Sequence, residues 1–310
     1  MTQAITDPKQ ASAALAELFG THKRVVFFGG AGVSTASGIP DFRSVDGLYH
    51  QQFAYPPETM LSHSFYEAHP AEFFDFYRTK MIALNAKPNR CHTKLAELER
   101  AGKLDAVVTQ NIDGLHQMAG SQRVFELHGS VHRNICQSCG AVYSVEWICS
   151  REHEDAAGVP VCPACGGRIK PDVVLYEEPL DEHVLTGAVA AIAAADALIV
   201  GGTSLVVYPA AGLTRYFTGD TLAICNLAPT DQDANADLLI SCDIAAAFAF
   251  WPARADTIER LSAKRPRRQL PKLGGVGILG GCSWRTTARH GGAESTSSAL
   301  TVRASWASST

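Results

Sequence analysis

The sequence predicts an α/β fold in which a doubly wound parallel sheet carries a smaller insert. Short apolar strand-like runs alternate with helical patterns along most of the chain, which favours parallel strands joined by crossover helices. The run Val25–Phe28 leads directly into glycines, as a buried strand entering a tight turn does. Residues 131–170 interrupt the alternation with short β pieces, turns and two pairs of cysteines.

The elements of the first half follow from apolar spacing. Helical spacing predicts a first helix over residues 8–20, and the β-branched and aromatic run that follows predicts the first strand. Residues 57–84 are expected to be helical, with an aromatic stripe that is typical of a core. Next we expect a helix over 91–101 and strands at Asp105–Thr109 and Val124–Leu127.

The same pattern resumes after the insert. We expect strands where short apolar runs end in polar or glycine residues, and helices where apolar residues recur at helical spacing. The expected strands are Val173–Leu175, Ala197–Val200, Thr221–Cys225 and Leu238–Ile240, and the expected helices are 181–195 and Tyr208–Tyr216.

This pattern divides the chain into a large domain, a small domain and a tail. The large domain is a Rossmann-like unit made of residues 8–45, 92–130 and 171–262. A helical module, residues 46–91, and a cysteine-rich module, residues 131–170, form the small domain. Residues 263–310 are basic and rich in Gly, Ser, Thr and Arg, so we expect disorder there.

Composition excludes several classes of protein. The 310-residue chain is 46% apolar but has no apolar run long enough to span a membrane, and its start lacks a secretory signal. Nine cysteines, an odd number, favour reduced thiols and a cytoplasmic location. The net charge is −11 for residues 1–263 and +7 for the rest. An acidic body argues against non-specific nucleic-acid binding by the folded part, and we expect no specific nucleic-acid partner.

The glycine-rich turn after the first strand predicts a nucleotide site. Gly30, Ala31 and Gly32 permit close approach of a pyrophosphate to the backbone. A dehydrogenase fingerprint continues differently, with an acidic residue about 20 positions on. Here Pro40 blocks a long helix, and Asp41, Phe42 and Arg43 form a trio suited to a loop over a ligand.

Further polar clusters follow the other predicted strands. Ligands of open parallel sheets bind beyond the carboxyl ends of the strands, so these clusters should share one crevice. They are Gly29–Thr35, Gln110–Asp113, His128–Ser130, Gly202–Ser204, Asn226 and Asp243.

His128 is the candidate general base of this crevice. A lone histidine more often packs or lies on the surface, but its place after a strand and an imidazole pKa near neutrality suit proton transfer. Asn111 and Asp113 lie one strand away and are able to orient a ribose and a carboxamide. The alternative for Asp113 is a turn or a helix N-cap.

Cys136, Cys139, Cys162 and Cys165 form two Cys-x-x-Cys pairs with 22 residues between them. This spacing predicts one tetrahedral, structural Zn²⁺ site. The alternative is buried or redox-active cysteine pairs. Cys149 lies between the pairs and is expected to take no part.

Taken together, these motifs resemble the sirtuin family, the NAD-dependent protein lysine deacylases, in a bacterial form. The resemblance covers roughly residues 8–250 and keeps the family order. It rests on GGAGVSTASGIPDFRS at 29–44, TQNIDGLHQMAG at 109–120, ELHGS at 126–130, the two cysteine pairs, KPDVVLYEE at 170–178 and GTSLVVYPAAGL at 202–213.

The resemblance implies a role for each matching residue. His128 acts as general base with Asn111 as its catalytic neighbour, and NAD is consumed rather than reduced. The implied NAD contacts are Gly30, Ala31, Gly32, Ser34, Asp41, Phe42, Arg43, Gln110, Asn111, Ile112, Asp113, Gly202, Thr203, Ser204, Asn226 and Asp243. Val173 and Val174 would pair with an acetylated protein or peptide substrate as an added strand, and Tyr176 would close the acyl-lysine tunnel.

The implied reaction releases lysine, nicotinamide and O-acetyl-ADP-ribose. The acyl oxygen attacks the ribose carbon that carries nicotinamide, and nicotinamide leaves. His128 then removes a proton from the ribose hydroxyls so that the 2′-oxygen attacks the imidate carbon, and water completes the release of the deacetylated lysine side chain. A mono-ADP-ribosyltransferase and a non-catalytic NAD or ADP-ribose sensor remain alternative functions that would use the same pocket. A nicotinamide dehydrogenase is a more distant one.

Two departures from the family pattern bear on the acyl group. Tyr176-Glu177 replaces the usual Phe-Gly. The Tyr-x-x-Arg pair of desuccinylating members aligns with Phe74 and Tyr77, and Arg78 lies one position away. We therefore expect acetyl-lysine to be preferred over acidic acyl-lysines.

Overall fold

The structure is a computed structural model that describes residues 3–42, 47 and 53–250. The predictions for Arg43, for residues 251–262 and for the basic tail 263–310 therefore lie outside the described residues.

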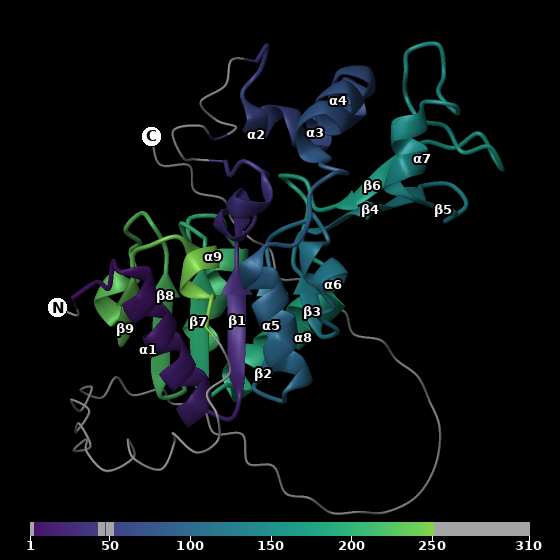
Figure 1. Ribbon diagram of the computed structural model, residues 1–310. Coiled ribbons are helices and arrows are strands. Elements are labelled where there is room, and N and C mark those ends of the chain that lie inside the picture. The colour runs from purple at the N-terminus through teal and green to yellow at the C-terminus, as the bar shows by residue number, and fades with distance from the viewer. Residues whose placement is uncertain (1–2, 43–46, 48–52, 251–310) are drawn as a thin grey trace, which may run out of the picture. The chain divides into compact units, whose positions relative to one another are not determined.

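A six-stranded parallel sheet forms the centre of the fold (Figure 1). Its strand order is β3-β2-β1-β7-β8-β9, and every neighbouring pair is parallel. The central strands β1 and β7 are buried along their whole length, as expected for a sheet covered on both faces. The strands are β1 Val25–Gly29, β2 Leu104–Thr109, β3 Val124–Glu126, β7 Ala197–Gly201, β8 Thr221–Cys225 and β9 Leu238–Ile240.

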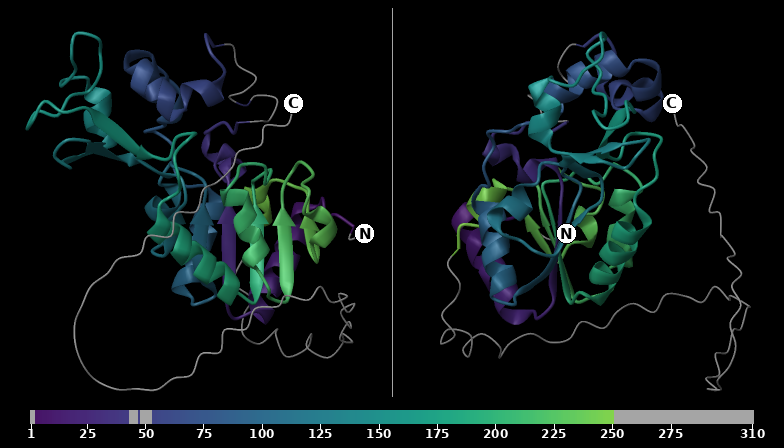
Figure 2. Two further views of the ribbon diagram at one scale, coloured as in Figure 1. Left: turned by 180° about the vertical axis from the view of Figure 1, so that it is seen from behind. Right: turned by 90° about the vertical axis from the view of Figure 1, so that its right-hand side faces the viewer.

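Helices cover both faces of this sheet (Figure 2). Alternate residues of β1 face opposite ways: Phe27 packs with the helices of one face and Phe28 with those of the other. The first face carries α1 Pro8–Thr21, α5 Arg90–Arg100 and α9 Ile244–Ala247, and the second carries α8 Glu182–Ala194 and the 3₁₀ helix η5 Ala210–Tyr216. The predicted doubly wound parallel fold is confirmed.

The cysteine-rich module contains a separate antiparallel sheet in the order β5-β4-β6. Its elements are β4 Gly129–Cys136, β5 Val142–Tyr143, α7 Val145–Ser150 and β6 Ile169–Val173. The strand predicted at Val173–Leu175 is therefore wrong in position. It ends at Val173 because the following residues turn to meet the helical module, where the Tyr176 N–H donates to the Leu61 carbonyl oxygen.

The helical module, which the sequence predicts over residues 57–84, is built from several short helices. Ser62 caps a new helix by accepting a hydrogen bond from the Phe65 N–H, and Pro70 starts the next one. The pieces are α2 Pro57–Met60, α3 His63–Ala68, α4 Pro70–Phe76 and the π-helical turn η4 Tyr77–Met81. The aromatic side chains still form a core, which packs against β4, α7 and β6.

The remaining connections are short. The helix predicted at Tyr208–Tyr216 begins at Ala210 and is 3₁₀ rather than α. Three further 3₁₀ turns and one α-helix complete the described elements: η1 Ala31–Val33, η2 Thr35–Ser37, η6 Asp233–Asn235 and α6 Leu115–Ala119.

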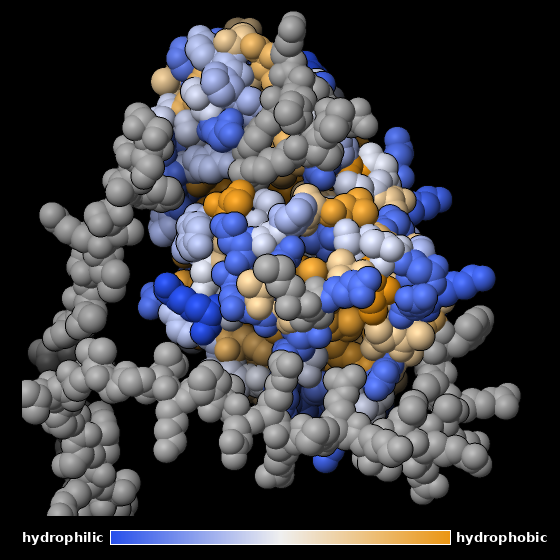
Figure 3. All heavy atoms as spheres, turned by 90° about the vertical axis from the view of Figure 1, so that its left-hand side faces the viewer, coloured by the Kyte–Doolittle hydropathy of each residue, from blue (hydrophilic) through white to orange (hydrophobic). Residues whose placement is uncertain are grey.

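The surface mixes hydrophilic and apolar side chains, as the face drawn in Figure 3 shows. Within the described residues, none of the helices combines the length and the apolar character that crossing a membrane requires.

Candidate active site and metal centre

The glycine-rich turn after β1 packs directly against the loop that follows β7. The Gly30 N–H donates to the Gly201 carbonyl oxygen at 3.1 Å, and the Gly32 N–H to that of Gly202 at 2.8 Å. A Cβ on Gly32 would lie 2.8 Å from the Gly202 Cα, and one on Gly30 would lie 2.7 Å from the Thr203 Cβ. Glycine is therefore required at both positions, because it lets two loops of the predicted crevice meet at their backbones.

Three predicted side chains meet beneath this turn. Ser34 is 1% exposed, and its hydroxyl donates to the Asp113 carboxylate at 2.6 Å. The Asn111 side-chain amide donates to the Ser34 Oγ at 3.0 Å. The second Asp113 oxygen accepts from the Leu115 N–H at 2.9 Å, at the start of α6. Asp113 thus fulfils the turn alternative, since the N-cap of α6 is Gly114, and it also belongs to the predicted polar cluster.

Gln110 and Thr203 connect the carboxyl ends of β2 and β7. The Gln110 side-chain amide donates to the Thr203 Oγ1 at 3.1 Å, and the Gln110 N–H donates to the Gly29 carbonyl oxygen at 2.9 Å. The loops after β1, β2 and β7 therefore form one connected rim, as the crevice prediction requires.

His128 lies beside this rim, and its Nδ1 atom is 3.0 Å from the Gln110 carbonyl oxygen. A carbonyl only accepts hydrogen bonds, so this contact requires Nδ1 to carry the proton and leaves Nε2 as the basic nitrogen. Burial lowers the pKa of His128, and the bond to the Gln110 carbonyl opposes that shift. A neutral imidazole with a free lone pair is the form that a general base needs.

The predicted substrate strand lies next to His128. Gly129 pairs with Val173, and the Val174 N–H donates to the His128 carbonyl oxygen at 3.0 Å. Gly129 has a φ of +75°, and a Cβ there would lie 2.0 Å from the Asp172 carbonyl oxygen. Only glycine allows this approach, so Gly129 is a site residue that sequence reasoning noted only as the neighbour of His128.

Other predicted contacts lie farther along the rim. Asn226 donates through its side chain to the Ala228 carbonyl oxygen, and Asp243 caps α9 by accepting from the Ala246 N–H. Phe42 and Ile112 are partly buried against the core of the helical module.

Four cysteine sulfurs gather at one point, all within 4.8 Å of one another. Cys136 and Cys165 are 3.5 Å apart, and Cys139 and Cys162 are 3.7 Å apart. Four thiolates at about 2.3 Å from a tetrahedral Zn²⁺ would lie about 3.8 Å from one another, so the cluster fits that ion. Cys149 is not part of the cluster, as predicted.

The surroundings of the sulfurs also fit a metal centre. The Tyr143 hydroxyl lies 3.0 Å from the Cys162 Sγ, where it can donate to a thiolate. A Cβ on Gly167 would lie 2.9 Å from the Cys136 Sγ, so this turn needs glycine to bring the sulfurs together. All four positions are sulfur, which leaves no open coordination position for catalysis.

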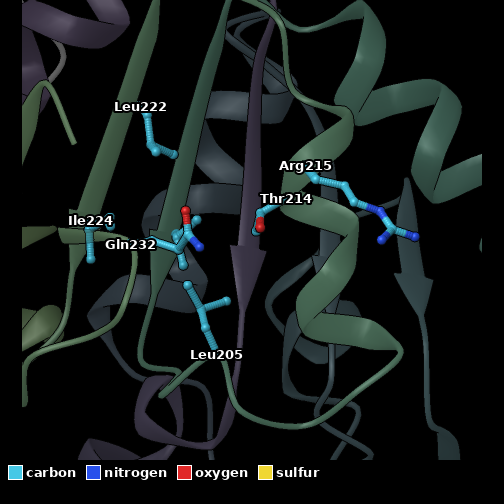
Figure 4. A pocket seen from close by; sticks show the side chains of 7 residues that line it. Leu205, Thr214, Arg215, Leu222, Ile224 and Gln232 are labelled. Carbon is cyan, nitrogen blue, oxygen red and sulfur yellow. The ribbon is translucent and has the colours of Figure 1, made fainter. Parts of the chain in front are cut away.

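A separate small cavity of about 80 Å³ lies between β7, β8 and η5 (Figure 4). Leu205, Leu222 and Ile224 line it, and the guanidinium of Arg215 extends away from Gln232. None of the predicted catalytic or metal residues lines this cavity, so it is not the candidate active site.

Comparisons with known proteins agree with this geometry. A family model described as the Sir2 family matches residues 30–209. An NAD-dependent protein deacetylase of Clostridium acetobutylicum is 58% identical over 222 residues, which are 71% of this chain and 89% of that protein. Its counterpart in Clostridium perfringens is 56% identical over 233 residues, covering 74% and 93%.

Solved structures agree as well. A Sir2 structure with a p53 peptide and NAD⁺ has a TM-score of 0.68 and 39% identity, covering 76% of this chain and 94% of that one. A Sir2 structure bound to acetylated peptide has a TM-score of 0.68 and 37% identity, with the same coverage. The chain belongs to the Sir2 family, as its sirtuin motifs predict.

Proposed function

We propose that this chain is an NAD-dependent protein lysine deacetylase that releases lysine, nicotinamide and O-acetyl-ADP-ribose. The observation that carries the proposal is the position of His128. Its Nδ1 is held by the Gln110 carbonyl, and its own carbonyl accepts from Val174 of the proposed substrate segment. One residue thus joins the proposed NAD crevice to the proposed peptide edge.

NAD would be held by the rim of the large sheet. The close packing of Gly30 and Gly32 against the loop after β7 leaves a narrow backbone turn suited to a pyrophosphate. Bound NAD supplies an electrophilic ribose carbon and nicotinamide as a neutral leaving group. The proposed contacts within the described residues are those that the sirtuin resemblance implies, from Gly30 to Asp243, with Asp41 and Phe42 on the loop over the ligand.

The chain's own residues orient the reactants and move one proton. The hydrogen-bonded set of Ser34, Asn111 and Asp113 is already ordered, so it can hold a ribose and a carboxamide at little further cost in entropy. His128 accepts the proton of a ribose hydroxyl at Nε2, while Nδ1 stays bound to the Gln110 carbonyl.

The acetylated peptide would add a strand beside Val173 and Val174, with Tyr176 at the acyl-lysine tunnel. Backbone pairing of this kind gives affinity without selecting a sequence, and a tunnel selects the modified lysine. The four cysteines would hold one structural Zn²⁺ that stabilises the cysteine-rich module and takes no part in the chemistry.

We also propose a function for each domain and a location in the cell. Residues 8–45, 92–130 and 171–262 would bind NAD, and residues 46–91 and 131–170 would form the small domain. None of the described cysteines forms a disulfide, which fits a reducing compartment, and we propose the cytoplasm.

Mass spectrometry of an acetyl-lysine peptide incubated with NAD tests the proposal. We expect loss of the acetyl mass together with one equivalent each of nicotinamide and O-acetyl-ADP-ribose. Label from NAD on a protein, with the peptide still acetylated, would instead indicate a mono-ADP-ribosyltransferase. Binding of NAD without turnover would indicate a sensor.

A further inference from the structure

The segment Val174–Tyr176 is held by backbone hydrogen bonds at both of its ends. At one end the Val174 N–H donates to the His128 carbonyl oxygen at 3.0 Å. At the other end the Tyr176 N–H donates to the Leu61 carbonyl oxygen, and the His63 N–H donates to the Tyr176 carbonyl oxygen, both at 3.0 Å. The segment proposed to bind the peptide therefore connects His128, the proposed base, to the start of helix α3 in the helical module.

Glu177 follows this segment in an unfavourable backbone conformation. Its φ is +77°, in the left-handed region that residues with a Cβ seldom adopt. A glycine would adopt it without strain. Such strain persists only where surrounding contacts hold the residue in place.

Those contacts are made by the Glu177 carboxylate. One oxygen accepts from the Ser64 N–H at 2.8 Å, and the other accepts from the Ser64 hydroxyl at 2.9 Å. The Ser64 N–H belongs to the first turn of α3, where backbone donors have no partner within the helix. A charged acceptor that binds two donors makes a strong and directional contact.

The neighbouring Glu178 reinforces the same end. It lies 2.8 Å from the His63 Nδ1, and it accepts from Lys170 at 3.0 Å and from the Leu175 N–H at 2.8 Å. Burial raises the pKa of the Glu178 carboxyl, but the hydrogen bonds from Leu175 and Lys170 lower it below its ordinary value on balance. The carboxylate therefore stays ionised, and it holds the turn that presents Glu177 to α3.

We propose that Glu177 is a positioning residue that fixes the peptide-binding segment to α3 through Ser64. The consequence for substrate rests on the proposed deacetylase function, whereas the attachment itself does not. With the carboxylate removed, Tyr176 and Val174 would sample positions away from the peptide edge. Peptide binding would weaken, and NAD binding would not.

Amide hydrogen exchange of the full chain tests the attachment without any turnover. In Glu177→Gln we expect the amides of Tyr176 and His63 to exchange at least about tenfold faster. Both amides form hydrogen bonds between the peptide-binding segment and the helical module, and these bonds should open more often once the Glu177 contact is weakened. The Val174 amide, held by His128, should change less. Ser64→Ala removes one of the two bonds at an exposed position and should give a smaller change of the same kind.

Kinetics then test the consequence for the substrate. Glu177→Gln should raise the peptide KM about threefold to tenfold, with kcat and the KM for NAD within about twofold. The double variant Glu177→Ala/Ser64→Ala should be no worse than Glu177→Ala alone, because Glu177→Ala already removes both acceptor oxygens. Glu58→Gln removes an exposed carboxylate from the same module and serves as the matched control.

Each result bears on one of the two claims. Unchanged exchange at Tyr176 and His63 in Glu177→Gln, or additive effects in the double variant, would overturn the attachment. Faster exchange with an unchanged peptide KM would overturn the positioning role. Faster exchange in Glu177→Gln, combined with a wild-type chain that deacetylates no peptide, would leave the attachment standing and would refute the proposed function instead.

Discussion

The Nδ1 atom of His128 lies 3.0 Å from the carbonyl oxygen of Gln110, and this single contact selects the tautomer of the proposed base. The main-chain carbonyl of Gln110 is held in turn, because the Gln110 N–H donates to the Gly29 carbonyl oxygen. The imidazole is therefore oriented by backbone atoms at the carboxyl ends of two neighbouring strands. No side-chain substitution nearby removes this orientation directly.

His128→Ala should lower kcat for deacetylation by roughly two to four orders of magnitude, the range for loss of a general base. NAD should still bind, since the proposed contacts from Gly30 to Asp113 remain. Steady-state kinetics and NAD titration measure the two effects. His183→Ala, at an exposed position on α8, is the control. Near-normal turnover of His128→Ala would refute the assignment.

Because burial lowers the pKa of His128, the imidazole should remain neutral below its ordinary pKa of about 6.5. Activity is lost on acidification only as Nε2 becomes protonated. The acid limb of kcat/KM for an acetylated peptide should therefore have its midpoint below about pH 6.5. Rate measurements from pH 5 to 8 test this, and a midpoint above pH 7 would contradict it.

Stability should also decrease in acid, because His92 and His116 are buried with ring centroids 4.7 Å apart. Burial lowers the pKa of His92 to about 4 and lowers that of His116 well below 6.5. The unfolded chain then binds more protons than the folded one between about pH 6.5 and 4. In that window each histidine should lower the free energy of unfolding by up to about 1.4 kcal/mol per pH unit on acidification.

Urea denaturation at several pH values measures this slope. His69→Gln, at an exposed position, should leave the slope unchanged. His116→Gln should flatten it. A wild-type free energy of unfolding that stays constant between pH 6.5 and 4.5 would show that the two imidazoles are not held neutral.

Zinc should be lost when any one of the four clustered cysteines is replaced. Cys136→Ser and Cys162→Ser should each reduce the bound zinc from one ion per chain to well below one, because a structural site needs all four ligands. Deacetylation should fall indirectly, since β4 ends at Cys136 and pairs with β6, which ends at the proposed peptide edge. Cys149→Ser should retain zinc. Elemental analysis decides, and wild-type protein without zinc would refute the site.

The parallel sheet could be predicted because each of its strands is a short apolar run with a polar or glycine end. Thr221–Cys225 and Leu238–Ile240 have the predicted bounds. The break at Ser62 inside the aromatic stripe was missed, although a serine three residues before Phe65 is a capping signal. Apolar residues continue across this break, since α2 and α3 bury the same core, and they conceal the change of helix.

The long-range contacts of the site could not be read from the chain. Residue types and strand ends bring Ser34, Asn111 and Asp113 to one crevice, but which hydroxyl meets which carboxylate depends on side-chain packing. Glu177 is a clearer case. The glycine that the sirtuin pattern usually has at this position is a signal for its left-handed φ, but nothing in the chain indicates its partner Ser64, which lies more than a hundred residues away.

Acetyl-lysine should be preferred over succinyl-lysine, because the guanidinium of Arg78 in the helical module is already bound to other groups of the chain. Arg78 donates from Nε to the Ile148 carbonyl oxygen at 3.0 Å and from Nη1 to that of Gly158 at 3.3 Å, and it forms a buried ion pair with Glu154. Its guanidinium also lies 5.4 Å from the centroid of the Phe74 ring. Releasing it toward an acyl group would leave the largely buried carboxylate of Glu154 unpaired, which is costly.

A succinyl carboxylate would therefore enter the acyl-lysine tunnel without a cation from Arg78, whereas an acetyl group needs none. We expect kcat/KM for an acetylated peptide to exceed that for its succinylated counterpart by at least about tenfold, or roughly 1.4 kcal/mol of transition-state discrimination. Paired peptides of one sequence measure the ratio. Tyr77 has a buried hydroxyl with no hydrogen-bond partner among the described residues. Equal or faster succinyl turnover that Tyr77→Phe abolishes would identify this hydroxyl as the acidic-acyl contact and would overturn the preference.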